Sequence, residues 1–288
     1  MSYGAQLGAA VALAAALAAC SGSERPSSDT TASAGAPGPA APAAITVTAK
    51  DYSFEGPAQV SAGLVSIDLE NHGKEVHQAQ LVKLEDGKTL KDLAEALKNH
   101  GPPPSWLKWM GGPNAVAPGQ RVTASSVLTP GQYAYLCLIP SPDGKMHVAK
   151  GMVRPFEVMA ASSASSAGLP SADHTIKLVD YDFQQSQPLT AGRRTILVEN
   201  TGPQPHELVL LKLPAGKKVE DFARWAESMK GPPPAEPVGG VVVLEKGGRA
   251  TFTADLQAGD YGLICFVPDS KDGKPHLVHG MMKNIKVG

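Results

Sequence analysis

Apolar and polar residues alternate along much of the chain after residue 44, and this period of two is typical of half-buried β-strands. ITVTA (45–49) and RVTASSVL (121–128) follow the alternation, while LVSIDLEN (64–71) is rich in β-branched residues and runs into an Asn-x-Gly turn. Turn residues are abundant, with 30 glycines and 25 prolines among 288 residues. The pattern therefore predicts β structure with many turns.

Two segments have a helical period instead. TLKDLAEALKNH (89–100) and KVEDFARWAESMK (218–230) each place four apolar residues on one face: Leu90, Leu93, Ala94 and Leu97 in the first, and Val219, Phe222, Ala223 and Ala226 in the second. Each segment runs into Gly-Pro-Pro-Pro, which ends a helix because proline cannot continue it and restricts the residue before it. We expect one short helix in each segment.

The same domain-sized unit occurs twice in the chain. Several segments return 128 or 129 residues later: DYSF (51–54) as DYDF (180–183), LENHGKEVH (69–77) as VENTGPQPH (198–206), and PGQYAYLC (130–137) as AGDYGLIC (258–265). A period of this length indicates a tandem duplication of a domain and not a solenoid.

The duplication divides the chain into a first module at 45–158 and a second module at 174–288, joined by a Ser- and Ala-rich linker at 159–173. Each module is long enough to have a single core. We predict an all-β protein in which each module is a small β-sandwich with one inserted helix on a long connection.

The first twenty residues have the composition of an export signal, because an apolar run that is too short to span a membrane ends in Leu-Ala-Ala-Cys. This sequence resembles the bacterial lipobox, and the resemblance implies lipidation of Cys20 and a place in the bacterial cell envelope, facing the periplasm or the exterior. No Lys or Arg precedes the apolar run, so an ordinary cleaved signal peptide stays an alternative. Residues 21–44 are rich in Ser, Ala, Gly and Pro and are expected to form a disordered tether.

The net charge of −1 gives no basic footprint, so we expect no nucleic-acid partner. The candidate chemistry lies elsewhere. Each module contains His, Cys and His-x4-Met in the same order: His77, Cys137, His147 and Met152 in the first, and His206, Cys265, His276 and Met281 in the second. Two imidazoles, one thiolate and a distal thioether form the ligand set of electron-transfer copper, and metal binding stabilises the thiolate.

These motifs are similar to those of the cupredoxins, the family of plastocyanin, azurin and the copper domains of larger oxidases. The similarity includes the Asn-x-Gly-x-x-x-His loop, the Tyr-x-x-x-Cys strand and the final His-x4-Met: Asn71, Gly73 and His77, YAYLC (133–137), and His147 and Met152, with Asn200, Gly202, His206, YGLIC (261–265), His276 and Met281 in the second module. The resemblance implies two tandem Greek-key β-sandwiches, copper in type 1 sites, one ion per module if both are filled, and one-electron transfer with protein partners.

One feature departs from plastocyanin-like proteins, since nine residues (138–146) or ten (266–275) separate the Cys from the second His. Copper nitrite reductases are more similar in this respect. SPDGK (141–145) and SKDGK (270–274) are typical of tight turns, which would bring the ends of each long loop together.

Other interpretations of these residues stay open. In these interpretations, the cysteines would be buried strand residues or disulfide partners. The methionines would belong to the core, and the second histidine of each module would lie in an exposed turn. His72, His100 and His174 have no counterpart in the other copy and are expected in solvent.

Three functions fit the ligand set. An electron carrier is favoured over an enzyme of the oxidase or nitrite-reductase kind, because no His flanks either Cys: the neighbours are Leu136 and Leu138, and Ile264 and Phe266. A copper-handling protein, which would exchange copper with a donor or acceptor, and a metal-free scaffold are the alternatives. If partners dock, Pro275, Leu277 and Val278 are expected to surround an exposed edge of the second His.

Overall fold

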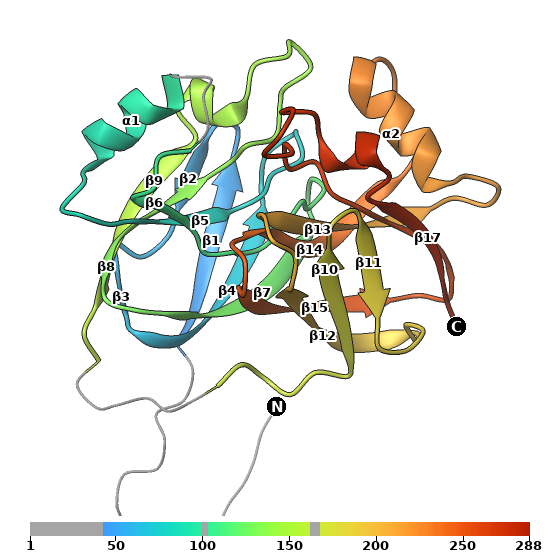
Figure 1. Ribbon diagram of the computed structural model, residues 1–288, viewed down its shortest axis with the longest axis horizontal. Coiled ribbons are helices and arrows are strands. Elements are labelled where there is room, and N and C mark those ends of the chain that lie inside the picture. Colours follow the sequence, from blue (N-terminus) through green and yellow to red (C-terminus); the bar gives the residue numbers. More distant parts are fainter. Residues whose placement is uncertain (1–42, 99–102, 162–167) are drawn as a thin grey trace, which may run out of the picture. The chain divides into compact units, whose positions relative to one another are not determined.

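Strands dominate the computed structural model, which describes residues 43–98, 103–161 and 168–288 (Figure 1). The predicted signal peptide, Cys20 and most of the predicted tether lie outside the described residues. Residues Pro39–Gly288 belong to one compact unit. The strands of the first module are β1 (Ala43–Lys50), β2 (Ser53–Glu55), β3 (Gln59–Ser61), β4 (Gly63–Asn71), β5 (Gln80–Leu84), β6 (Leu107–Trp109), β7 (Arg121–Leu128), β8 (Gly131–Leu136) and β9 (Val153–Met159).

The second module has the same order of elements, except that no strand among its described residues corresponds to β3. Its strands are β10 (His174–Val179), β11 (Asp182–Gln185), β12 (Gly192–Asn200), β13 (His206–Leu213), β14 (Glu236–Leu244), β15 (Arg249–Leu256), β16 (Gly259–Ile264) and β17 (Met282–Val287). A single α-helix occurs in the described part of each module, α1 (Leu90–Lys98) and α2 (Val219–Ser228). The predicted all-β fold with one inserted helix per module is confirmed.

Each module is a sandwich of two sheets. In the first, β7-β4-β1-β2 faces β3-β9-β8-β5-β6, and in the second, β11-β10-β12-β15 faces β14-β13-β16-β17. Apolar residues from both layers fill each interior, among them Ile67, Leu81 and Tyr135 in the first module. His174, which we expected in solvent, begins β10 and is only 4% exposed, because the inward side of this strand is part of the core.

The helices cover the outer faces of the ligand-bearing sheets. Leu93 of α1 packs with Val82 of β5 and Leu136 of β8. Phe222 of α2 packs with residues of β13 and β16 in the same way. These strands are therefore buried on both faces, which explains why their sequences are more continuously apolar than those of the other sheet.

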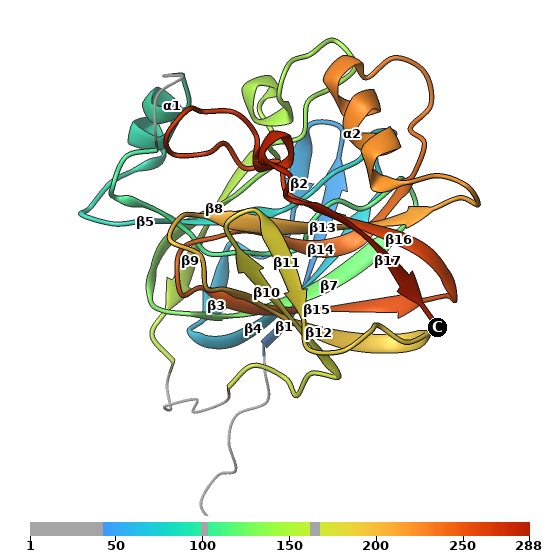
Figure 2. The same ribbon diagram turned by 45° about the vertical axis from the view of Figure 1, so that its right-hand side comes forward.

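The two modules share one eight-stranded sheet, which sequence patterning did not predict. β7 and β15 pair antiparallel at its centre, with Ala124 opposite Phe252, and they lie side by side in Figures 1 and 2. These two residues are counterparts in the duplication, 128 positions apart. A pair of equivalent residues that face each other lies on a local two-fold axis, so the modules meet through an isologous contact like that of a symmetric dimer.

A second ribbon has the same symmetry. Pro113 faces Val241, again 128 residues apart, and the bridge between Met110 and Leu244 has its counterpart in the bridge between Val116 and Val238. The ribbon thus joins residues 110–116 to β14. Among the described residues, no helix has the length and apolar character needed to cross a membrane.

Gly240 in this ribbon also shows how closely β14 approaches β13 within the second module. It has φ +127°, and a Cβ at this position would lie 2.0 Å from the carbonyl oxygen of Leu208 in β13. We expect Gly240→Ala to lower the free energy of unfolding by about 3 kcal/mol or more, through left-handed strain and backbone overlap together. Chemical denaturation of the metal-free chain measures the change.

The matched control is Gly247→Ala, at φ +78° with nothing within 4 Å of the added Cβ. This substitution has only the conformational cost, about 1 kcal/mol. Equal losses in the two variants would show that the close approach to Leu208 does not matter.

Candidate metal centres

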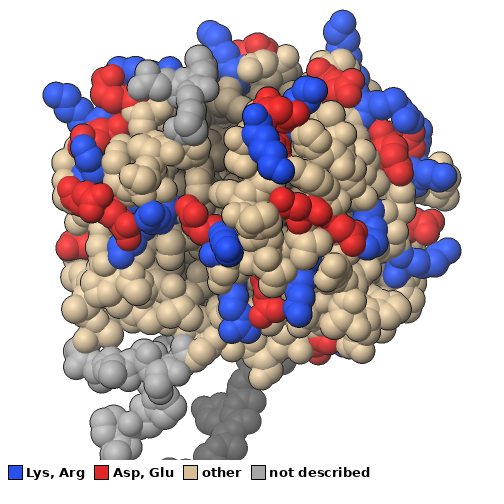
Figure 3. All heavy atoms as spheres, in the orientation of Figure 1, with Lys and Arg blue, Asp and Glu red and all other residues tan. Residues whose placement is uncertain are grey.

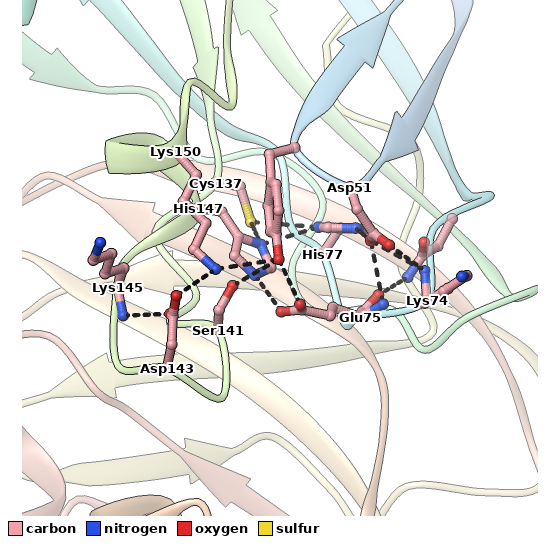
Figure 4. Close-up of polar contacts among 12 residues, drawn as sticks. Asp51, Lys74, Glu75, His77, Cys137, Ser141, Asp143, Lys145, His147 and Lys150 are labelled. Carbon is pink, nitrogen blue, oxygen red and sulfur yellow. Dashed lines mark hydrogen bonds and ion pairs between the residues drawn. The ribbon is translucent and has the colours of Figure 1, made fainter.

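Three of the predicted ligands converge in the first module (Figure 4). His77 precedes β5, Cys137 follows β8 and His147 begins a short 3-10 turn, yet their ligand atoms all lie within 4.8 Å of one another. The Nδ1 atoms of the two imidazoles are 3.1 Å apart, and the Cys137 Sγ lies 3.3 Å from His147 Nδ1 and 3.9 Å from His77 Nδ1. All three residues are 0% exposed.

The long Cys-to-His loop folds back on itself. The Ser141 N–H donates to the carbonyl of Lys145 at 2.8 Å, which closes a tight turn at the predicted SPDGK segment. Beyond the turn, the His147 N–H donates to the carbonyl of Ile139 and the Val148 N–H donates to that of Cys137. The extra length is absorbed by this small hairpin, so it does not separate the Cys from the His.

The Asn-x-Gly loop holds the first histidine. The Asn71 side chain accepts the Gly73 N–H at 2.8 Å and donates to the carbonyls of Glu75 and Val116. A Cβ on Gly73 would lie 2.6 Å from His77 Nε2. Glycine is therefore required here because the turn lies directly against the imidazole.

Two carboxylates, which the sequence analysis did not identify, bind the far edges of the imidazoles. His77 Nε2 lies 2.8 Å from Asp51 Oδ1, and His147 Nε2 lies 2.8 Å from Glu75 Oε2 (Figure 4). Asp51 belongs to the repeated DYSF motif, so its recurrence as Asp180 was the available signal. A carboxylate that accepts from Nε2 requires the proton on that nitrogen.

The tautomer determines what the centre can bind. With both Nε2 atoms protonated and neutral rings, the two Nδ1 lone pairs face each other and the Cys137 sulfur with no proton between the nitrogens. Buried lone pairs that face one another are unfavourable unless a proton or a cation lies between them. The residues present fit a soft or borderline cation bound by two nitrogens and one sulfur.

Burial disfavours the charged forms of both cysteines and of three of the histidines, His77, His206 and His276. It raises the pKa of Cys137 to about 12 and also raises the pKa of Cys265. It lowers the pKa of His77 and His206, and together with the charge of His206 it lowers the pKa of His276 to about 4. At neutral pH the cysteines are therefore thiols, and metal binding must release a thiol proton.

The second module repeats the arrangement. The Nδ1 atoms of His206 and His276 are 2.9 Å apart, the Cys265 Sγ lies 3.4 Å from His276 Nδ1, and all three residues are 0% exposed. His206 Nε2 lies 2.7 Å from Asp180 Oδ1, as in the first module.

The carboxylate beside the second histidine differs between the modules. Gln204 replaces Glu75, and the carboxylate comes instead from Asp269, whose Oδ2 is 3.8 Å from His276 Nε2 and accepts from Tyr181 and Gln204. These bonds hold the pKa of Asp269 well below its usual range. His276 Nε2 has no hydrogen-bond partner in the described part of the chain, so the two centres are electrostatically unequal.

The remaining predicted ligands are buried nearby. Met152 and Met281 are both 0% exposed, and their carbonyls accept the N–H of Cys137 and Cys265 at 3.3 and 3.2 Å. Both cysteines are free, so neither is a disulfide partner. The role of Met152 and Met281 in the ligand set stays a prediction.

The prediction of a docking patch around an exposed edge of His276 is wrong, because this edge is not exposed. His276 is 0% exposed and Leu277 only 7%, because the 3-10 turn that contains them packs against β13 and β16. Only Val278, at 57%, is largely exposed. The His276 ring therefore has no solvent-exposed edge.

A third group of possible ligands, Asp269, Asp272 and His279, lies beside the second centre. His279 Nε2 is 3.2 Å from Asp272 Oδ1. In the first module, Lys150 and Asp143 form an ion pair at the equivalent place. The group therefore corresponds to a surface pair of the duplicated fold, with His in place of Lys.

Charges of both signs are interspersed on the face drawn in Figure 3. Such a surface has no extended field of one sign to steer a charged partner.

The two sandwiches, each with His, Cys and His gathered beside the ends of one sheet, have a cupredoxin-like fold in tandem. No protein-family model matches the sequence, and no curated protein matches it.

Several solved structures are similar. An auracyanin from Roseiflexus castenholzii matches 42% of this chain and 99% of its own at 20% identity, with a TM-score of 0.30. Auracyanin A from Chloroflexus aurantiacus matches 42% of the length of this chain and 100% of its own length, at 17% identity and with a TM-score of 0.30. A Cu-containing nitrite reductase from Thermus scotoductus matches 86% of this chain and 62% of its own at 13% identity and a TM-score of 0.25.

Replacing Glu75 tests whether the carboxylates tune the centres. We expect Glu75→Gln to weaken Cu²⁺ binding at the first module by about 10–100-fold, because a neutral acceptor makes the His147 imidazole a weaker donor. A competition titration measures the affinity in a chain with Cys265→Ser, in which only the first centre keeps its thiolate.

Glu70→Gln is the matched control. Glu70 Oε2 lies 3.3 Å from Nε2 of His72, which is exposed and not a proposed ligand. This variant should bind copper as the parent does, and an equal loss would mean that general charge, not the bond to His147, sets the affinity.

Proposed function

We propose that this chain is an extracytoplasmic electron carrier that holds copper in type 1 sites in both modules. The observation that supports this function most is that two imidazole Nδ1 atoms and one sulfur of buried residues converge in each module. In the first module, carboxylates bonded to both Nε2 atoms also fix the tautomers. The residues that would hold copper are His77, Cys137 and His147, with their counterparts His206, Cys265 and His276, and with Met152 and Met281 as the distal thioethers.

Copper, when bound, would supply reversible one-electron chemistry. The chain's own residues supply the rest. Burial excludes water from the donors, and the carboxylates and the Asn-x-Gly loop hold the imidazoles in one orientation. A centre whose ligands are held in place has little to rearrange when its charge changes, which favours electron transfer over ligand exchange.

The same features make copper delivery the weaker candidate. A delivery site exchanges its ion with a partner, which is easiest at exposed ligands, whereas the His, Cys and His of both modules are 0% exposed. Catalysis at a linked second copper is also less well supported, because the residues that flank Cys137 and Cys265 are apolar and offer no ligand. Redox proteins outside the cytoplasm are the proposed partners.

The copper content and the visible spectrum test this function. In residues 21–288 loaded with Cu²⁺, we expect about two coppers per chain and an intense thiolate-to-copper absorption band, as the duplicated ligand set requires. Cys137→Ser and Cys265→Ser should each remove the absorption of one site and leave the fold intact. Absence of tight copper binding, or absorption that survives both substitutions together, would refute the proposal.

We also propose that a lipid on Cys20 anchors the protein to the cell envelope, with residues 21–44 as the tether. Cys20→Ser should move the protein from the membrane fraction to the soluble fraction, because a lipid chain contributes about 0.8 kcal/mol per buried CH₂ and a free chain has no such anchor. Detergent partitioning after fractionation measures this. A substituted chain that stays with the membrane would contradict the anchor, and Ser21→Ala is the control that should change nothing.

A further inference from the structure

A buried glutamate lies directly beside the second centre. Glu207 follows the ligand His206 and is 6% exposed. Its N–H donates to the Cys265 sulfur at 3.5 Å, and its Oε1 accepts the N–H of Phe266 at 3.0 Å. Glu207 thus contacts both sides of the Cys265 ligand, through the sulfur and through the next peptide.

The other oxygen of this carboxylate is bound from the first module. Asn114, which is 0% exposed, donates from Nδ2 to Glu207 Oε2 at 3.2 Å, to the carbonyl of Leu208 at 3.0 Å and to that of Val241 at 3.2 Å. A buried carboxylate needs such donors, because an unpaired one is costly. Asn114 therefore determines where the Glu207 side chain and the start of β13 lie.

Asn114 is itself held by the first centre. Its Oδ1 accepts the Ala115 N–H at 2.7 Å, and the next residue, Val116, exchanges backbone hydrogen bonds with the ligand His77. A continuous series of covalent and hydrogen bonds thus runs from His77 through Asn114 to Glu207.

The link has no symmetric counterpart. The two-fold axis relates Asn114 to Val242 and Glu207 to Gln78, and a valine side chain cannot donate a hydrogen bond. The first module therefore supports the second centre through a side chain, while the second module offers no equivalent side chain to the first centre at this position.

We propose that Asn114 is a positioning residue of the second metal centre, which is incomplete without the first module. Asn114 acts through Glu207, whose N–H donates to the Cys265 sulfur and whose carboxylate accepts the N–H of Phe266, the residue that follows Cys265. This inference rests on the proposed function, since it concerns how one of the two proposed copper sites is built.

The competing explanation is that Asn114 only joins the modules. Gln80 provides the matched control, because its side chain also crosses the contact, accepting the Val243 N–H at 2.9 Å and donating to the Val243 carbonyl at 3.2 Å. It is 0% exposed, like Asn114, and its other side-chain bonds go to the carbonyls of Leu81 and Gly111. Among the residues described, it is therefore not bonded to the ligands of the second centre or to Glu207.

The test uses residues 21–288 with Cys137→Ser, so that only the second centre keeps its thiolate, and Co²⁺ as the probe. Thiolate-to-cobalt absorption reports the Cys265 bond, and competition titration gives the affinity. We expect Asn114→Ala to weaken Co²⁺ binding by about 10-fold or more and to shift this absorption. Gln80→Ala should lower the thermal midpoint of the metal-free chain while leaving both the affinity and the absorption unchanged.

A double-substitution cycle with Glu207→Gln strengthens the test. The new amide has an NH₂ group in place of one carboxylate oxygen, so a donor faces either Asn114 Nδ2 or the Phe266 N–H and one of the two bonds is lost; we expect it to weaken binding in the same way. Because the two changes disrupt one contact, the doubly substituted chain should lose no more affinity than the worse single variant. Should Asn114→Ala not fold, Glu207→Gln alone is decisive, because it conserves side-chain size.

Parent-like Co²⁺ binding in Asn114→Ala, losses equal to those of Gln80→Ala, or fully additive losses in the cycle would each overturn the inference while leaving the proposed function intact. If the parent with both cysteines binds neither Cu²⁺ nor Co²⁺, the proposed function fails first and the inference fails with it.

Discussion

The hydrogen bond between a carboxylate and the far nitrogen of an imidazole is the interaction on which both centres depend. It fixes the proton on Nε2 and leaves Nδ1 as a lone pair directed inward. In the first module two such bonds direct two lone pairs at each other across 3.1 Å, beside a buried sulfur. The rest of the fold, from the Asn-x-Gly turn to the small hairpin after Cys137, maintains this otherwise unfavourable arrangement of donors.

Burial of the ligands limits which molecules can reach the two centres. With the His, Cys and His of both modules fully buried, nothing from solvent reaches a donor atom unless the loops open. This protects the thiols, whose raised pKa already makes them poor nucleophiles at neutral pH. In the proposed function, it also means that a redox partner would exchange electrons across at least one layer of protein.

The sequence was sufficient for those features that are local or duplicated. Strand alternation, the two helices and the all-β sandwiches followed from periodicity, and the gathering of His77, Cys137 and His147 was expected from their order in both copies. The supporting carboxylates were missed because Asp51 and Glu75 are remote in sequence from the ring that each contacts. The shared sheet was missed because β7 and β15 alternate like any half-buried strand, and nothing in that pattern specifies what lies at the edge. His174 was misjudged because a lone polar residue at a strand start gives no indication of burial.

The two-fold ribbon between the modules has a consequence for how the chain could change over generations. Two separate copies of one gene product, meeting through such a contact, would acquire every substitution twice, once on each side of the axis. Joined in one chain, the copies vary independently, and a residue such as Asn114 can appear on one side while Val242 occupies the other. Fusion thus allows the two modules to acquire different functions, which the identical subunits of a symmetric dimer cannot do, because a substitution in one module leaves the other unchanged.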